Sequence, residues 1–300
     1  MGQLLSLLTA MRPRQWTKNL IVLLPLVFTI NLFWDPRNAE ETLDVIASAA
    51  AAFGLFCLLS SSVYLFNDLA DAEKDRLHPK KASRGVASGR LSKGLAAFTA
   101  VLFAGAALPL GFLIDVRYGW AQLAYVGIAA IYIIILRRLV ILDVFAISAG
   151  FVVRAAAGAL VISADPSPWL YICTGLGALF IGFAKRRQEL ITLQDDGVGH
   201  RASLGGYSLP MLDQLITMLM ASTLIAYILY TFSADNLPGN DAMMFTIPFV
   251  AFGIARYFYL VHAKQAGGSP EDILLKDVPI LLSVVGWVAA TVGILWAYRG

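Results

Sequence analysis

Four acidic side chains lie where a long apolar run meets a basic loop, within the stretch Asn67–Asp75. Three of them, Asp68, Asp71 and Asp75, are spaced i, i+3 and i+7, which places them on one face of a helix. Mg²⁺ prefers such oxygen ligands, usually one or two carboxylates together with substrate phosphates. A solvated helix end is the alternative. The stacking of the acids, with Asn67 extending the cluster towards the apolar side, instead favours a site for Mg²⁺ and a phosphorylated ligand.

A second charged group follows another apolar run. The residues Lys185–Glu189 come directly after Trp169–Ala184. Lys185 and Glu189 are four residues apart, so a stabilising ion pair on one helix face, or simple anchoring at the membrane surface, would explain them. However, acidic and basic helix ends placed side by side are what a phosphorylated substrate with Mg²⁺ requires. The planar guanidinium of Arg186 suits bidentate binding of phosphate.

Two arginines interrupt apolar runs. Arg154 lies within Val140–Ile162, where an unpaired charge would be costly. We therefore expect it to face a polar cavity and to pair with Asp143 or with a substrate phosphate. Arg256 either extends to the membrane surface or forms a structural pair.

The composition is that of a polytopic membrane protein. Hydrophobic residues make up 58% of the chain and charged residues 14%, with a mean hydropathy of +0.71. Cys57 and Cys173 lie inside apolar runs and predict neither a disulfide nor a metal site. No Walker loop, zinc spacing or Ser-His-Asp set occurs, and nothing indicates a nucleic-acid partner. Residues 1–18 are expected to form an interfacial segment, because the apolar patch Leu4–Met11 is too short to span a membrane and basic residues follow it.

Hydropathy predicts an all-α fold with nine transmembrane helices. The expected spans are Asn19–Phe33, Leu43–Phe66, Leu95–Ile114, Trp120–Leu136, Val140–Ile162, Trp169–Ala184, Met211–Phe232, Ala242–His262 and Val278–Tyr298. Most of the 23 lysines and arginines fall in alternate breaks between these spans. By the positive-inside rule those breaks, the N-terminus and both charged groups are cytoplasmic, and the C-terminus is external.

These motifs resemble the UbiA-type intramembrane prenyltransferase superfamily, whose members have nine transmembrane helices and an Asn-Asp-x-x-Asp-x-x-x-Asp motif. The likeness extends over nearly the whole chain and is closest to the branch that transfers phosphoribosyl groups to polyprenyl phosphates. It rests on Arg12-Pro13-Arg14-Gln15-Trp16, Lys18-Asn19, Tyr64-Leu65, Asn67-Asp68, Asp75-Arg76, His78-Pro79, Arg154-Ala155, Lys185-Arg186, Glu189-Leu190 and Pro270-Glu271-Asp272-Ile273. The resemblance implies one domain over residues 1–300, a UbiA-like bundle around a central cavity open to the cytoplasmic side.

The second motif departs from the superfamily. Most members place aspartates there to hold a prenyl pyrophosphate, whereas this chain has Lys185, Arg186 and Glu189. A basic site is better suited to phosphoribosyl pyrophosphate, which carries a separate 5-phosphate. The resemblance therefore implies Mg²⁺-dependent transfer of 5-phosphoribosyl to a decaprenyl-type polyprenyl phosphate, with release of pyrophosphate. It also implies a role in cell-wall arabinan precursor synthesis, a plasma-membrane location, lipid contacts and a homo-oligomer, a trimer in the family.

The implied site has several parts. The metal ligands are Asp68, Asp71 and Asp75; the candidates for the donor phosphates are Arg76, Lys81, Arg84, Lys185 and Arg186; those for the acceptor phosphate are Lys18 and Arg154; further substrate contacts are Asn67, Glu189 and Tyr207. The acceptor phosphate is largely dianionic at neutral pH, because its second pKa is about 6, so it needs no general base. The loops Gly197–Pro210 and Gln265–Pro279 are expected to exclude water. In the second loop Glu271, Asp272 and Asp277 either contact ribose hydroxyls or cap a helix.

Two other functions fit parts of the pattern. A prenyltransferase that uses a prenyl pyrophosphate and an aromatic or quinone-precursor acceptor would share the fold and the first motif. A non-enzymatic lipid-phosphate transporter would also place charges at helix ends. The transporter predicts polar groups on both sides of the membrane, and the external breaks are nearly bare of them.

Overall fold

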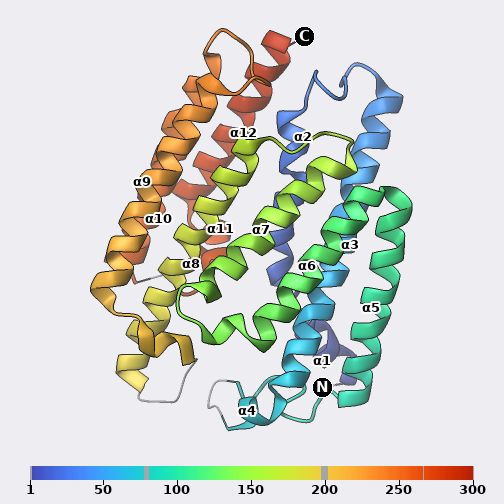
Figure 1. Ribbon diagram of the computed structural model, residues 1–300, viewed down its shortest axis with the longest axis vertical. Coiled ribbons are helices and arrows are strands. Elements are labelled where there is room, and N and C mark those ends of the chain that lie inside the picture. The colour runs from blue at the N-terminus through green and yellow to red at the C-terminus, as the bar shows by residue number, and fades with distance from the viewer. Residues whose placement is uncertain (1, 78–80, 197–201, 266, 300) are drawn as a thin grey trace.

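The computed structural model describes residues 2–77, 81–196, 202–265 and 267–299, and these residues are almost entirely helical (Figure 1). The α-helices are α1 (Gln3–Ala10), α2 (Leu24–Phe28), α3 (Ala39–Ala70), α4 (Ala72–Arg76), α5 (Lys93–Ile114), α6 (Val116–Ile134), α7 (Leu142–Val161), α8 (Pro168–Asp196), α9 (Leu209–Ser233), α10 (Ile247–Ala263), α11 (Pro270–Lys276) and α12 (Val278–Arg299). The 3₁₀ helices are η1 (Pro13–Leu23), η2 (Leu136–Arg138), η3 (Ala202–Gly206) and η4 (Ala242–Thr246). The predicted all-α class is confirmed for the described residues.

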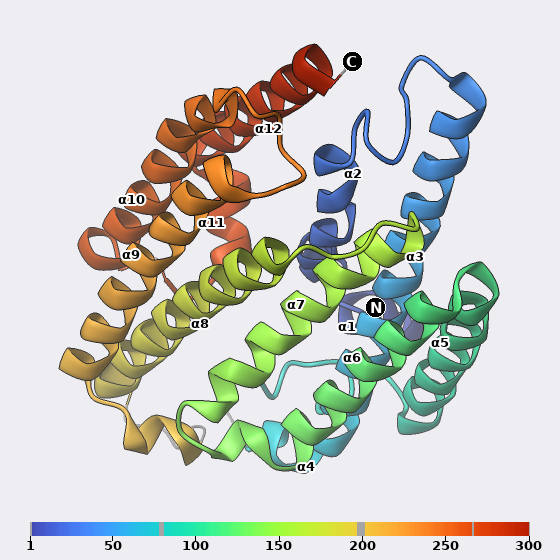
Figure 2. The same ribbon diagram turned by 45° about the horizontal axis from the view of Figure 1, so that its top comes forward.

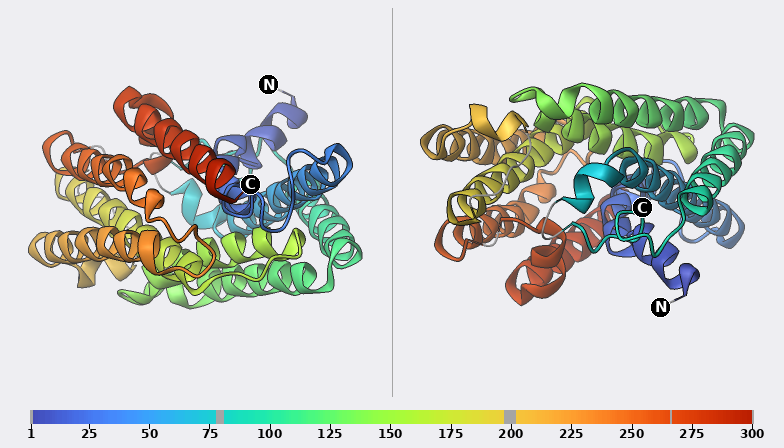
Figure 3. Two further views of the ribbon diagram at one scale, coloured as in Figure 1. Left: turned by 90° about the horizontal axis from the view of Figure 1, so that it is seen from above. Right: turned by 90° about the horizontal axis from the view of Figure 1, so that it is seen from below.

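The long helices follow one another around a ring. In the order α3, α5, α6, α7, α8, α9, α10 and α12, each helix contacts the next. The short helix α2 contacts α12, α7 and α3 and closes the ring between α12 and α3 (Figures 2 and 3). Since η1 leads directly into α2 and lies against α3 and α7, the N-terminal segment is placed on the inner side of the ring.

Seven of the described helices are long and apolar enough to cross a membrane, compared with the nine spans expected. The seven are Ala39–Ala70, Lys93–Ile114, Leu142–Val161, Pro168–Thr192, Leu209–Ser233, Ala242–Ala263 and Val278–Arg299. The predicted first span is divided between η1 and α2. The predicted fourth span corresponds to α6, whose hydropathy is reduced by Arg117 and Gln122. The protein is a multi-pass membrane protein.

The two charged motifs differ from expectation in where their helices end. Helix α3 continues past the predicted limit at Phe66 and ends at Ala70, so Asn67 and Asp68 belong to it. Asp71 is its C-terminal cap, and Asp75 lies in the separate helix α4. Helix α8 continues through the whole second motif. The expected loop Gly197–Pro210 and the His78-Pro79 pair lie partly or wholly outside the described residues.

A glycine allows the N-terminal segment to approach the ring. At Gly158 in α7 a Cβ atom would overlap the carbonyl group of Val22 in η1. Any larger residue would therefore push η1 away from α7. This close approach between η1 and α7 fixes how far the polar residues of η1 lie inside the ring of helices.

Candidate active site

Two of the three predicted metal ligands converge on one point. Asp68 is buried in α3, and Asp75 is buried in α4. Arg84 Nη1 lies 3.3 Å from Asp68 Oδ1 and 2.8 Å from Asp75 Oδ2. Arg12 Nη2 donates to Asp68 Oδ1 at 2.6 Å, with its guanidinium 4.8 Å from the centre of the Tyr64 ring. The buried carboxylates thus already bind a cationic group, as a pair of metal ligands would.

Asp71 does not join this pair. It makes a bidentate ion pair with Arg137, at 2.7 and 3.0 Å. The expectation of three acids on one helix face differs from the structure here, because α3 stops at Ala70 and the chain changes direction between Asp68 and Asp75. Among the described residues no group of three His, Cys, Asp or Glu side chains is arranged to hold a metal ion.

The other predicted residues of the first motif are more exposed. Arg76 donates to the carbonyl oxygen of Ala87 at 3.0 Å and pairs with Glu73, so it braces the loop after α4. Lys81 is exposed, and Asn67 is half-buried beside Asp68. Of the basic candidates Arg76, Lys81 and Arg84, only Arg84 contacts the carboxylates of Asp68 and Asp75.

The second motif is organised around Arg186, whose side chain is only 1% exposed. Its Nε donates to Asp143 Oδ2 and its Nη1 to Glu189 Oε2, both at 2.7 Å. The alternative that Lys185 and Glu189 form an ion pair is therefore wrong, because Arg186 pairs with Glu189 instead. Lys185 has no carboxylate within 4.0 Å among the residues that the structure describes, and it lines a cavity. That leaves one cation of the motif available to a ligand.

Tyr207 holds Asp143, the carboxylate that pairs with Arg186. Its hydroxyl donates to Asp143 Oδ1 at 2.7 Å and accepts from the backbone N–H of Ile141 at 2.6 Å. Ile141 has a φ of +70°, which is strained for a β-branched residue. Burial, followed by the hydrogen bond to Asp143, raises the pKa of Tyr207, which therefore remains a neutral donor. Tyr207 thus positions Asp143 and, through it, Arg186.

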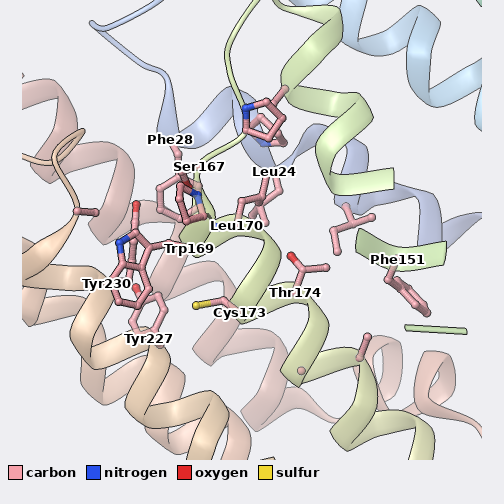
Figure 4. Close-up of a pocket in the computed structure, with 18 of the residues that line it drawn as sticks. Leu24, Phe28, Phe151, Ser167, Trp169, Leu170, Cys173, Thr174, Tyr227 and Tyr230 are labelled. Atoms are coloured by element: carbon pink, nitrogen blue, oxygen red, sulfur yellow. Dashed lines mark hydrogen bonds between the residues drawn. The ribbon is translucent and has the colours of Figure 1, made fainter. Parts of the chain in front are cut away.

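A cavity of about 990 Å³ opens beside the second motif. At one end it is lined by Lys18, Lys185, Arg186 and Glu271. Its other end is aromatic, and Figure 4 shows the rings of Phe28, Trp169, Tyr227 and Tyr230 grouped there near Cys173. Between the two ends the lining is mostly apolar, with Ile21, Leu24, Phe151 and Leu170 among its residues. The cavity therefore has a mostly cationic end and a long apolar body, and its lining also includes Asp165 and Asp235.

Lys18 and Glu271 face each other at the charged end. Lys18 Nζ is 3.8 Å from Glu271 Oε2, and Gln15 Nε2 donates to Glu271 Oε1 at 2.6 Å. Burial lowers the pKa of Lys18, opposed by Glu271 and reinforced by Arg154 and Arg12. For Glu271, burial raises the pKa, but Lys18 and the hydrogen bond from Gln15 outweigh it and leave the pKa lowered. Glu271 is therefore a carboxylate at neutral pH.

Arg154 is buried, does not line this cavity as expected, and has no carboxylate within 4.0 Å among the residues that the structure describes. Its Nη2 donates to Tyr125 Oη at 2.8 Å, and its guanidinium lies 4.5 Å from the Tyr125 ring centre and 5.3 Å from that of Phe151. Its Nε has no hydrogen-bond partner among the described residues. The alternative that Arg154 pairs with Asp143 is wrong, because Asp143 is engaged by Arg186, Ser203 and Tyr207.

The structure also separates residues that the sequence left undecided. Arg256 forms a structural pair with Asp277, at 2.9 Å between Nη2 and Oδ2. Asp277 accepts from the N–H of Ile280 and so caps α12. Asp272 pairs with Lys276. Of the three acids considered for ribose, only Glu271 lines the cavity.

Three contributors to the site were given no role from the sequence. Arg12 and Gln15 belong to a quoted motif, yet only the structure shows that they hold Asp68 and Glu271. Arg137 lies in a break that the positive-inside rule places in the cytoplasm, between Trp120–Leu136 and Val140–Ile162, and it pairs with Asp71. Their signal in the sequence was weak because each partner is remote in the chain.

Comparison with known proteins gives the same picture. The profile of the UbiA prenyltransferase family matches residues 22–271. The chain belongs to the UbiA prenyltransferase family. A decaprenyl-phosphate phosphoribosyltransferase of Mycolicibacterium smegmatis is 32% identical to it over 96% of this chain and 91% of that protein. One of Mycobacterium tuberculosis is 30% identical over 96% and 93%.

A solved structure supports the UbiA fold. A UbiA homologue from Archaeoglobus fulgidus, bound to GPP and Mg²⁺, superimposes with a TM-score of 0.72 over 97% of this chain and 99% of that chain. The two sequences are 16% identical, so this likeness concerns the fold alone. The UbiA-like architecture predicted from the motifs is confirmed.

Proposed function

We propose that this UbiA-family protein transfers 5-phosphoribosyl from phosphoribosyl pyrophosphate to a polyprenyl phosphate of the decaprenyl type, releasing pyrophosphate. The observation that carries this proposal is the cavity with a cationic end and an apolar body. Between Pro168 and Lys185, both of which line it, helix α8 rises about 25 Å at 1.5 Å per residue. That length accommodates a prenyl chain, with its phosphate at Lys18. The names of the relatives from Mycolicibacterium smegmatis and Mycobacterium tuberculosis support the same reaction.

The acidic pair suits Mg²⁺. Asp68 and Asp75 already share one cationic group, Arg84 Nη1, and carboxylate oxygens are the ligands that Mg²⁺ prefers. We assign Asp68 and Asp75 as ligands, with Asp71 available only if its pair with Arg137 opens. When bound, Mg²⁺ would neutralise the charge that develops on the leaving pyrophosphate. Arg84 and Arg12, released from the carboxylates, would then contact the pyrophosphate oxygens.

The remaining residues position the two phosphorylated substrates. Lys185 lines the cavity and has no ion-pair partner in the described part of the chain, and the Nε of the buried Arg154 has no hydrogen-bond partner there. We assign Lys185 to the donor and Lys18 with Arg154 to the acceptor phosphate. Asp143 and Glu189 hold the Arg186 guanidinium in a fixed position beside Lys185. Attack on ribose C1 then needs orientation and exclusion of water, and it needs no proton transfer.

We further propose that the charged end faces the cytoplasm and that η1 with α2, and α6, complete nine crossings. The support is the positive-inside distribution of basic residues, together with the 19-residue length of α6. The product would serve cell-wall arabinan synthesis, as the family resemblance implies.

The reaction can be tested directly with purified protein, labelled phosphoribosyl pyrophosphate, Mg²⁺ and polyprenyl phosphates of several lengths. We expect a labelled lipid and free pyrophosphate. The comparison reaction supplies geranyl pyrophosphate and an aromatic acid in place of the two substrates. Prenylation of the acid without any phosphoribosyl transfer would replace the proposed function with that of an aromatic prenyltransferase.

A further inference from the structure

The charged end of the cavity contains one anion that neither the metal nor the phosphates explain. Glu271 lines the cavity among Lys18, Lys185 and Arg186, in a site expected to attract phosphates. A carboxylate there repels the anionic parts of both substrates. Its presence calls for a partner that is not a phosphate.

Glu271 is held in one orientation and is incompletely bonded. Gln15 Nε2 donates to Oε1 at 2.6 Å, which fixes the carboxylate plane. The other oxygen, Oε2, is buried and has no hydrogen-bond donor among the described residues. The ammonium of Lys18 is 3.8 Å away, beyond hydrogen-bond distance. A buried acceptor left in this state is costly, so a donor supplied by a ligand would bind it favourably.

We propose that Glu271 accepts hydrogen bonds from the vicinal hydroxyl groups of the donor's ribose ring. This inference rests on the proposed function, since it assigns a residue to the sugar of phosphoribosyl pyrophosphate. Glu271 lines the cavity together with Lys18, which we assign to the acceptor phosphate, and Lys185, which we assign to the donor, and the ribose is the part of the donor that meets the acceptor. When the acceptor phosphate draws the ammonium of Lys18 towards itself, Oε2 becomes accessible to the hydroxyl groups.

The backbone around Glu271 fits a fixed binding residue. Pro270 begins α11, which contacts η1. The preceding loop is pressed against α8, because a Cβ atom on Gly267 would lie 2.9 Å from the carbonyl oxygen of Ala184, the residue before Lys185. Glu271 and Lys185 are therefore held at a defined separation. Asp272, next in sequence, pairs with Lys276 away from the cavity lining and provides a matched control.

The test compares wild type, Glu271→Gln and Asp272→Asn with phosphoribosyl pyrophosphate and with its 2-deoxy and 3-deoxy ribose analogues. Glu271→Gln keeps an oxygen for Gln15 and replaces Oε2 with an amide donor. In the wild type, removing a hydroxyl should lower kcat/KM about tenfold to a hundredfold, the effect of one hydrogen bond to a charged group. In Glu271→Gln this discrimination should fall to about threefold or less, while Asp272→Asn keeps it.

Equal hydroxyl discrimination in wild type and Glu271→Gln would overturn the inference and leave Glu271 as a counter-charge for the lysines. So would a wild type that is indifferent to both deoxy analogues. If Glu271→Gln is unstable, Glu271→Asp, which keeps the charge but withdraws it by one methylene, should show the same loss of discrimination. A wild type that transfers no phosphoribosyl group to any polyprenyl phosphate would instead refute the proposed function itself.

Discussion

Replacing the two buried arginines separately tests which of them serves the substrate. Arg154→Met and Arg186→Met remove the same charge and keep similar length, but the environments differ. Arg186 contacts Asp143 and Glu189 at 2.7 Å, whereas Arg154 contacts the hydroxyl and ring of Tyr125 and, among the described residues, no carboxylate. We expect Arg154→Met to fold normally and to bind the acceptor poorly, and Arg186→Met to unfold easily.

The magnitudes follow from these contacts. Arg154→Met loses about 1 kcal/mol for the hydrogen bond to Tyr125 and about 1–2 kcal/mol for the cation–π contact. It regains about 2.5–3.5 kcal/mol by removing an unpaired charge from an apolar helix. The loss and the gain nearly cancel, so the free energy of unfolding should change by about 1.5 kcal/mol or less. Arg186→Met leaves Asp143 buried and unpaired, which costs about 3–5 kcal/mol.

Two measurements on detergent-solubilised protein decide the matter, thermal unfolding and the dependence of rate on polyprenyl phosphate. We expect Arg154→Met to raise the KM for the acceptor roughly tenfold to a hundredfold, because it removes one charge-assisted contact to phosphate. Its Tm should remain close to that of the wild type. A variant with a clearly lowered Tm and an unchanged acceptor KM would refute the assignment of Arg154 to the substrate.

Three further expectations concern the metal site, the packing of η1 and the effect of pH. Asp68→Asn should abolish most Mg²⁺-dependent turnover while the protein still folds, and chelation should mimic it; undiminished turnover of this variant would contradict the assignment. Gly158→Ala should destabilise the protein by about 1–3 kcal/mol, because its Cβ overlaps Val22, and thermal unfolding measures this. Because burial lowers the pKa of Lys18, the charge of its ammonium group is lost as pH rises through a value below that of an ordinary lysine. Acceptor binding should weaken over that range in the wild type, and an identical alkaline profile in Lys18→Gln would argue against a phosphate contact.

The sequence was sufficient for the class, the family and the general position of both charged motifs. Composition alone indicated a polytopic membrane protein, and the apolar runs located each of the seven long helices. Helix ends were less predictable. The chain breaks at Asp71 although the sequence from Asp68 to Asp75 is compatible with one continuous helix. That single break separates Asp71 from the other two acids.

The pairing of charges depended on helix packing and so was not predictable from spacing. Lys185 and Glu189 are correctly spaced for an ion pair, but Arg186 reaches Glu189 because Asp143 from α7 holds its other side. Likewise, Arg12 reaches Asp68 across 56 residues of chain. Local rules describe neighbours on one helix, whereas the site is assembled from α3, α4, α7, α8, α11 and η1.

The 3₁₀ geometry of η1 gives the N-terminal segment three distinct faces. With three residues per turn, side chains three apart stand directly above one another. Asn19 and Val22 form a buried row against the ring, Lys18 and Ile21 form a row along the cavity, and Leu20 on the third side is half exposed. An α-helix would rotate each such row by about 60° per step and so turn successive members of the row away from the cavity. The segment therefore lines the cavity in a straight row. A bound chain would pass from the ammonium group of Lys18 to the hydrocarbon of Ile21 over about 6 Å.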